Sequence, residues 1–218
     1  MVMIADTEVK RIYFFGFAGL AASLLVGVGE FLIHYSSSGY SGVVDFLWLR
    51  NSSYPAVIMG HYLMLIGLPL YILGYYHFYF SIRTGNEIMA RTILVFGIIS
   101  FMTGGVWAGS RALLTEIVKS GNLSLLDYYK QHYEILVNVM RVFILIISIC
   151  WTTAILISKT LYPKWMAIVN PILILGLVFV TYFVFPSFGK YLVPTAMNVT
   201  HFIFFSLSIF SIYKTTRS

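Results

Sequence analysis

Cysteine and charged residues are both scarce in this chain. Only one cysteine, Cys150, occurs among the 218 residues, which excludes an intrachain disulfide and a cysteine-cluster metal site. Charged residues make up 10% of the chain, whereas they make up about 25% of a typical soluble domain. The composition therefore excludes an ordinary soluble globular protein.

Hydrophobic residues, in contrast, account for 59% of the chain, and the mean hydropathy is +0.86. These values predict an integral membrane protein, with residues 1–218 forming a single transmembrane domain. The net charge of +6 comes from basic residues at the ends of apolar runs, so it indicates membrane topology and not nucleic-acid binding. Lys10 and Arg11 precede about 22 apolar residues without a small-residue cleavage pattern, which predicts a retained first helix.

The apolar runs predict an all-α bundle of about six transmembrane helices. The expected spans are 12–34, 56–80, 90–110, 134–158, 165–185 and 195–213. Lys and Arg are concentrated in the N-terminus, in segments 81–91 and 159–164 and in the tail after residue 214. The positive-inside rule then places both termini in the cytoplasm and the longer loops, 35–55 and 111–133, outside. The plasma, or inner, membrane is the expected location.

Strongly polar residues recur within these spans at helical spacing. Residues three, four or seven positions apart share one helix face, and the polar positions are Glu30 with His34, Trp107 with Arg111, Glu134 with Asn138 and Arg141, and Asn198 with His201. When the spans are laid across the membrane, all these faces fall in the outer half. The second span adds His61 and Tyr62 at that depth. Ionisable groups inside a membrane usually face a partner or a cavity, so we expect one convergent polar site.

We expect Glu30, His61, Asn138, Arg141 and His201 to line one cavity in the outer half. Arginine stays charged, so Arg141 requires an acidic partner, and Glu30 and Glu134 are the candidates. The fifth span has only Thr181 and Tyr182 at this depth, and we place it at the periphery, facing lipid.

The side chains of this cluster suggest distinct roles. Histidine and glutamate exchange protons when their surroundings tune them, so the candidate catalytic residues are Glu30, His34, His61 and His201. The candidate ligand-binding residues are Tyr62, Trp107, Arg111, Glu134, Asn138, Arg141 and Asn198. The sequence identifies no particular metal and no cofactor.

Several functions fit this pattern. The leading interpretation is a pocket for an amphiphilic or lipid-like molecule, with an arginine holding an anionic head group and with acid/base chemistry as an extension. Membrane lipid is then the expected partner.

A metal or haem site using the histidines and Glu30 is an alternative, although no HxxxH or HExxH motif occurs. A proton-coupled transporter is a third, but the cytoplasmic halves of the spans contain few polar groups. His77 and Asn170, near the cytoplasmic ends, are interpreted as helix-packing groups. A purely structural role for the whole cluster also remains open.

Overall fold

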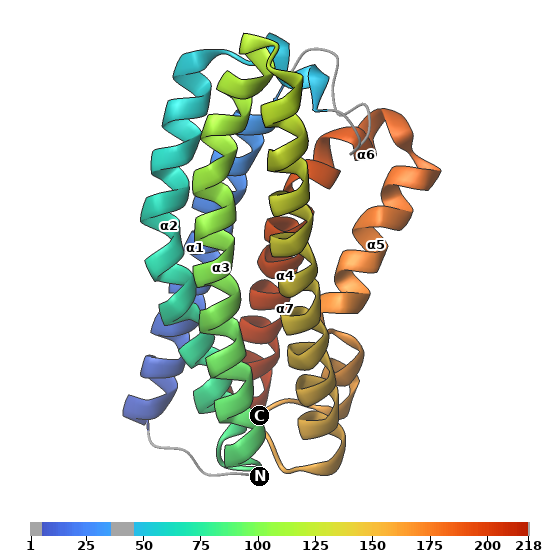
Figure 1. Ribbon diagram of the computed structural model, residues 1–218. Coiled ribbons are helices and arrows are strands. Elements are labelled where there is room, and N and C mark those ends of the chain that lie inside the picture. The colour runs from blue at the N-terminus through green and yellow to red at the C-terminus, as the bar shows by residue number, and fades with distance from the viewer. Residues whose placement is uncertain (1–5, 36–45, 218) are drawn as a thin grey trace.

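The computed structural model describes residues 6–35 and 46–217 of the chain. Within these ranges all regular elements are helices, and no strand occurs (Figure 1). The α-helices are α1 (Asp6–His34), α2 (Tyr54–Ile82), α3 (Glu87–Ser120), α4 (Leu123–Ile157), α5 (Pro171–Val184), α6 (Pro186–Leu192) and α7 (Ala196–Arg217). Three short 3-10 helices are η1 (Leu47–Asn51), η2 (Lys164–Ile168) and η3 (Val193–Thr195). The all-α prediction is confirmed.

Five segments are long and apolar enough to cross a membrane. They are α1, α2, α3, α4 and the stretch Pro186–Thr216, which contains α6, η3 and α7. The fifth predicted span, 165–185, is not one long helix. It consists of η2, a break at Val169 and Asn170, and α5 with 14 residues. At 1.5 Å per residue α5 is about 21 Å long, less than the roughly 30 Å of a bilayer core.

Local sequence signals explain where these helices start and stop. Asn side chains cap three N-termini by accepting hydrogen bonds from the backbone amides three residues later, at Asn86, Asn122 and Asn170. Proline at the first turns of α5 and α6 fixes their starts, because it cannot continue a preceding helix. Gly121, with a φ of 71°, ends α3 in the left-handed conformation that glycine tolerates.

One of the two predicted external loops, 111–133, is shorter than expected. α3 continues for ten residues beyond the predicted end at 110, and α4 begins eleven residues before the predicted start at 134. The segment 111–133 therefore consists largely of helix, with a tight turn at Gly121 and Asn122. Part of the other loop, 36–45, lies outside the described residues. We call the end of the bundle with this α3–α4 turn the outer end, following the Lys/Arg distribution.

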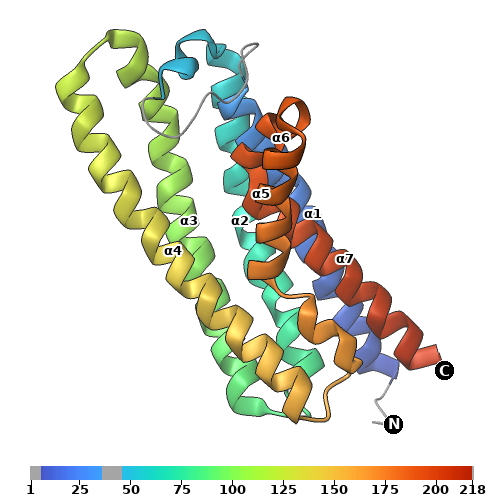
Figure 2. The same ribbon diagram turned by 90° about the vertical axis from the view of Figure 1, so that its right-hand side faces the viewer.

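The helices pack side by side in an almost closed ring. α2 lies between α1 and α3, α3 packs on α4, and α7 lies between α1 and α5. α4 contacts η2 and α5 near the inner end, but the two helices diverge toward the outer end (Figures 1 and 2). The backbones of α4 and α5 are therefore farther apart in the outer half than at the inner end (Figure 2).

Aromatic side chains and glycines hold the centre together. The rings of Phe78 and Phe204 stack with centroids 4.4 Å apart, and Trp151 packs edge-on against both. α1 and α2 approach most closely where glycines face each other: a Cβ added at Gly29 would come within 2.5 Å of the Gly60 carbonyl oxygen. Gly67 and Gly74 repeat this close approach at intervals of seven residues along α2.

Candidate functional site

A buried network of charged and polar side chains lies at the outer end, centred on Glu30. One Arg111 Nη atom donates to Glu30 Oε1 at 3.0 Å, and both side chains are at least 94% buried. Asn198 Nδ2 donates to the other carboxylate oxygen at 2.6 Å. The network thereby joins α1, α3 and α7. It also gives the Glu30 carboxylate two hydrogen-bond donors, and a buried charge requires such partners.

Two tyrosines extend this network. Tyr71 donates its hydroxyl proton to Asn198 Oδ1 at 2.7 Å, and Arg111 donates to the Tyr133 hydroxyl at 2.7 Å. α2 and α4 are thus connected to the same cluster. The sequence analysis did not include either tyrosine among the candidate site residues. Their i, i+4 neighbours, Tyr75 and Tyr129, mark faces that turn inward and were the available signal.

Arg111 also lies against Trp107 and His34. Its guanidinium carbon is 3.4 Å from the Trp107 ring centroid, in cation–π geometry. His34 Nδ1 lies 3.1 Å from an Arg111 Nη atom and 2.8 Å from the Glu30 carbonyl oxygen. A guanidinium only donates and a carbonyl only accepts. His34 Nδ1 therefore either donates to the Glu30 carbonyl or accepts from Arg111, according to its tautomer.

The expected pairing of Arg141 with an acidic residue is wrong. Glu30 pairs with Arg111, while Arg141 is exposed and donates to Asn138 Oδ1 at 2.8 Å. Within residues 6–35 and 46–217, no carboxylate lies within ion-pair distance of Arg141. Arg111 was treated as interfacial because the third span was expected to end at residue 110. Since α3 continues to Ser120, Arg111 is shielded inside the bundle.

The three polar residues of α4 form an exposed stripe that the rest of the cluster does not contact. Glu134, Arg141 and Ser148 follow one another at intervals of seven residues, and Asn138 and Thr152, fourteen residues apart, lie in the adjacent row. Ser148 accepts from the amide of Ile172 in α5, and Thr152 donates to the carbonyl of Ala167 in η2. Residues seven apart share a helix face, so the polar stripe lies on the side of α4 that contacts α5 and η2 further inward.

The remaining predicted residues are dispersed. His201 is buried and its Nε2 lies 2.9 Å from the Tyr75 hydroxyl, one turn further inward than Asn198. His61 is partly buried and packs near Gly109, while Tyr62 is 61% exposed on the outside of α2. The single cavity predicted from Glu30, His61, Asn138, Arg141 and His201 is therefore corrected. The structure separates an internal network from an exposed stripe.

A second buried polar cluster lies toward the inner end. His77 Nε2 and the Tyr162 hydroxyl each lie 2.6 Å from Ser208 Oγ, and His77 Nδ1 donates to the Ile12 carbonyl at 2.9 Å. His77 is thus a helix-packing group, as interpreted, and it connects α1, α2 and α7. The inner end therefore also contains a small buried polar cluster, to which Ser208 and Tyr162 contribute hydroxyl groups.

An aromatic layer separates the two polar regions. The Phe205 ring centroid is 6.3 Å from that of His201 and also 6.3 Å from that of His77. The hydrogen bonds between described residues do not cross this layer. No three His, Cys, Asp or Glu side chains in the described part of the chain come close enough together to hold a metal ion.

Comparisons of the chain with protein-family models, with curated proteins and with solved structures found no match. The class of protein must therefore come from the fold itself. Apolar helices of membrane-spanning length, packed side by side with polar residues buried between them, are characteristic of a multi-pass integral membrane protein.

Proposed function

We propose that this membrane protein binds an amphiphilic molecule with an anionic head group on the exposed polar stripe of α4, in the outer half of the bundle. Arg141 is the head-group ligand in this proposal. The observation that carries it is an exposed guanidinium on an apolar helix, with an amide as its partner and without a carboxylate among the described residues.

An unpaired arginine at this position is costly unless an anion accompanies it. Arg141 lies 16 residues from the inner end of α4 at Ile157, or about 24 Å along the helix axis, which is within the thickness of a bilayer core. Glu134 lies two turns further out, about 10 Å away along the axis, and does not neutralise it. A carboxylate or phosphate would accept two parallel hydrogen bonds from the guanidinium.

Apolar side chains continue the stripe inward from Arg141. Leu145 and Ile149 are 47% and 56% exposed, and they follow on the same side of α4. A hydrocarbon chain entering from the membrane would lie along these side chains while its head group reaches Arg141 and Asn138. This combination of apolar surface and a few polar groups is typical of ligand sites.

The internal network supports this site by fixing the helices around it. Both carboxylate oxygens of Glu30 accept hydrogen bonds, from Arg111 and from Asn198, and both ring nitrogens of His201 have partners in Tyr75 and the Met197 carbonyl. Such mutual pairing favours a structural role for these groups and favours binding over acid/base catalysis. The donors do not cluster for a metal, and Phe205 interrupts the polar groups that a proton path would require, so the geometry favours neither alternative.

A nitroxide-labelled fatty acid, which has a carboxylate head group, tests the proposal in purified protein reconstituted in neutral lipid. We expect saturable binding that Arg141→Gln weakens about tenfold or more, because a hydrogen bond to a charged group contributes about 1.5–3 kcal/mol. A labelled fatty alcohol with the same chain should bind the wild type and the variant equally. Arg91→Gln, which removes an exposed arginine at the inner end of α3, is the matched control. Equal binding to both variants would contradict the proposal.

A further inference from the structure

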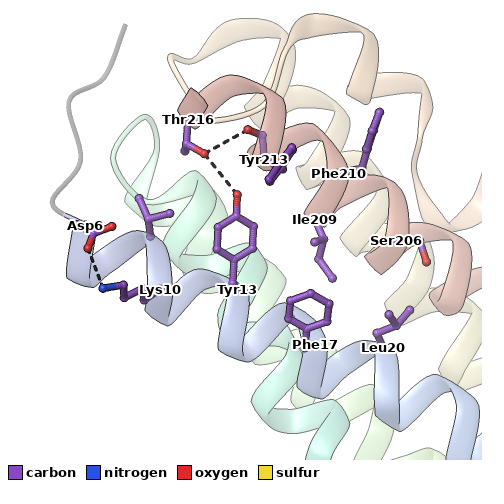
Figure 3. Close-up of a pocket in the computed structure, with 11 residues that line it drawn as sticks. Asp6, Lys10, Tyr13, Phe17, Leu20, Ser206, Ile209, Phe210, Tyr213 and Thr216 are labelled. Carbon is purple, nitrogen blue, oxygen red and sulfur yellow. Dashed lines mark hydrogen bonds and ion pairs between the residues drawn. The ribbon is translucent and has the colours of Figure 1, made fainter. Parts of the chain in front are cut away.

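A groove on the outside of the bundle, between α1 and α7, offers a second site at the inner end. It has a volume of about 870 Å³ and is lined by Asp6, Val9, Lys10, Tyr13, Phe17, Leu20, Ser206, Ile209, Phe210, Tyr213 and Thr216 (Figure 3). The volume is within the usual range for small-molecule sites, about 300–1,000 Å³. α4 lies on the other side of the bundle (Figure 2), so this groove is separate from the proposed α4 site.

The polarity of the groove changes along its length. Its inner end holds the Asp6–Lys10 ion pair, with a separation of 2.9 Å, and the Tyr13 hydroxyl, which is 3.3 Å from Thr216 Oγ1 (Figure 3). Toward the middle of the membrane the lining becomes apolar at Phe17 and Leu20. A molecule matching this gradient has a polar head at the helix ends and an apolar chain directed into the bilayer.

The charge at the polar end favours an anionic head group. Lys10 shares its ammonium group with Asp6 but has three donor hydrogens. Lys214 does not line the groove itself, but its Nζ lies 4.7 Å from the ring centroid of Phe210, a lining residue, and no carboxylate lies within ion-pair distance of it in the described part of the chain. Basic pockets between transmembrane helices on the cytoplasmic side are typical sites for anionic lipid head groups.

We infer that this groove binds one anionic phospholipid from the leaflet at the inner end. Its phosphate is held by Lys10 and Lys214, and an acyl chain lies on Phe17 and Leu20. A second copy of this chain is a poorer occupant, because dimerisation through the groove would bring both lysines of each copy into an apolar interface, where unpaired charges are costly.

Native mass spectrometry of the protein released from mixed bilayers tests this inference, with phosphatidylglycerol and phosphatidylcholine as the two probes. We expect the wild type to retain phosphatidylglycerol preferentially. Lys10→Gln with Lys214→Gln should reduce that preference about thirtyfold, which corresponds to about 1 kcal/mol for each lysine. The control pair is Lys130→Gln with Lys190→Gln, which removes two lysines from the outer end and should leave the preference unchanged.

A second variant distinguishes specific binding in the groove from general electrostatic attraction to a charged surface. Leu20→Trp fills the apolar end without altering charge and should reduce retention of phosphatidylglycerol while the lysines remain. Inorganic phosphate at the concentration of the lipid phosphate should not displace the lipid. Retention that Leu20→Trp leaves unchanged, displacement by free phosphate, or a dimer that the lysine variants dissociate would each overturn the inference. The unfolding temperature in detergent verifies that each variant is folded.

Discussion

At the scale of single residues, the Glu30–Arg111 pair has the clearest energetic consequence. Both side chains are buried, and removing one partner leaves a charge without compensation, which costs about 3–5 kcal/mol. We therefore expect Glu30→Gln to destabilise the protein by that amount. Glu30→Gln combined with Arg111→Gln should recover part of the loss, because neither charge then remains. Unfolding of the single and double variants in mild detergent measures the coupling free energy.

The Glu87–Arg91 pair provides the control for this cycle. It also lies on α3, but its side chains are 41% and 71% exposed, and exposed pairs contribute only about 0–1 kcal/mol. The corresponding Gln variants should therefore differ little from the wild type. If the Glu30–Arg111 cycle gave a coupling as small as this control, the buried pair would not hold the outer end together.

At the scale of helices, the glycines between α1 and α2 determine how closely those helices pack. A Cβ added at Gly60 would collide with the backbone carbonyl of Gly29 and approach Ile33 at 2.9 Å. A rigid helix backbone cannot yield as a flexible side chain does, so Gly60→Ala should destabilise the protein by about 1–3 kcal/mol. Gly176→Ala on α5 is the matched change, since an added Cβ there meets open space. Unfolding measurements that give both variants the same stability would contradict close packing of α1 on α2.

Sequence patterns predicted the positions of the helices more accurately than the interaction partners of the polar side chains on them. Hydrophobic runs indicated the class and most of the spans, because length and polarity are local properties. They also placed Glu30, Arg111, Asn198 and Arg141 at similar depths. Depth does not define rotation about each helix axis, however, and rotation decides that Arg111 faces Glu30 while Arg141 faces outward.

Two element-scale errors have physical causes as well. The fifth span was read as one apolar run, although Asn170 and Pro171 terminate η2 and start α5. The sequence analysis also did not predict the close contact between α1 and α2. The heptad repeat of Gly60, Gly67 and Gly74 was present in the sequence and indicated the closer contact.

At the scale of the whole molecule, the separation of α4 from α5 in the outer half accompanies the exposure of the polar residues of α4. It results from the tilt of α4 relative to α5, which depends on packing against η2 at one end and on the α3–α4 turn at the other. Long-range packing of this kind has no signature in a single sequence. The polar stripe gains its proposed function only from this arrangement, since the same residues facing α3 would be buried.

The central claim is that an anionic amphiphile occupies the α4 stripe. Photo-crosslinking with a diazirine-labelled fatty acid, followed by peptide mass spectrometry, maps its position directly. We expect adducts concentrated between residues 134 and 149 of α4 and on the facing surface of α5, and we expect Arg141→Gln to remove this concentration. Adducts spread evenly over exposed residues of α2 and α3, such as Ile66 and Met102, and unchanged in the variant, would contradict the claim.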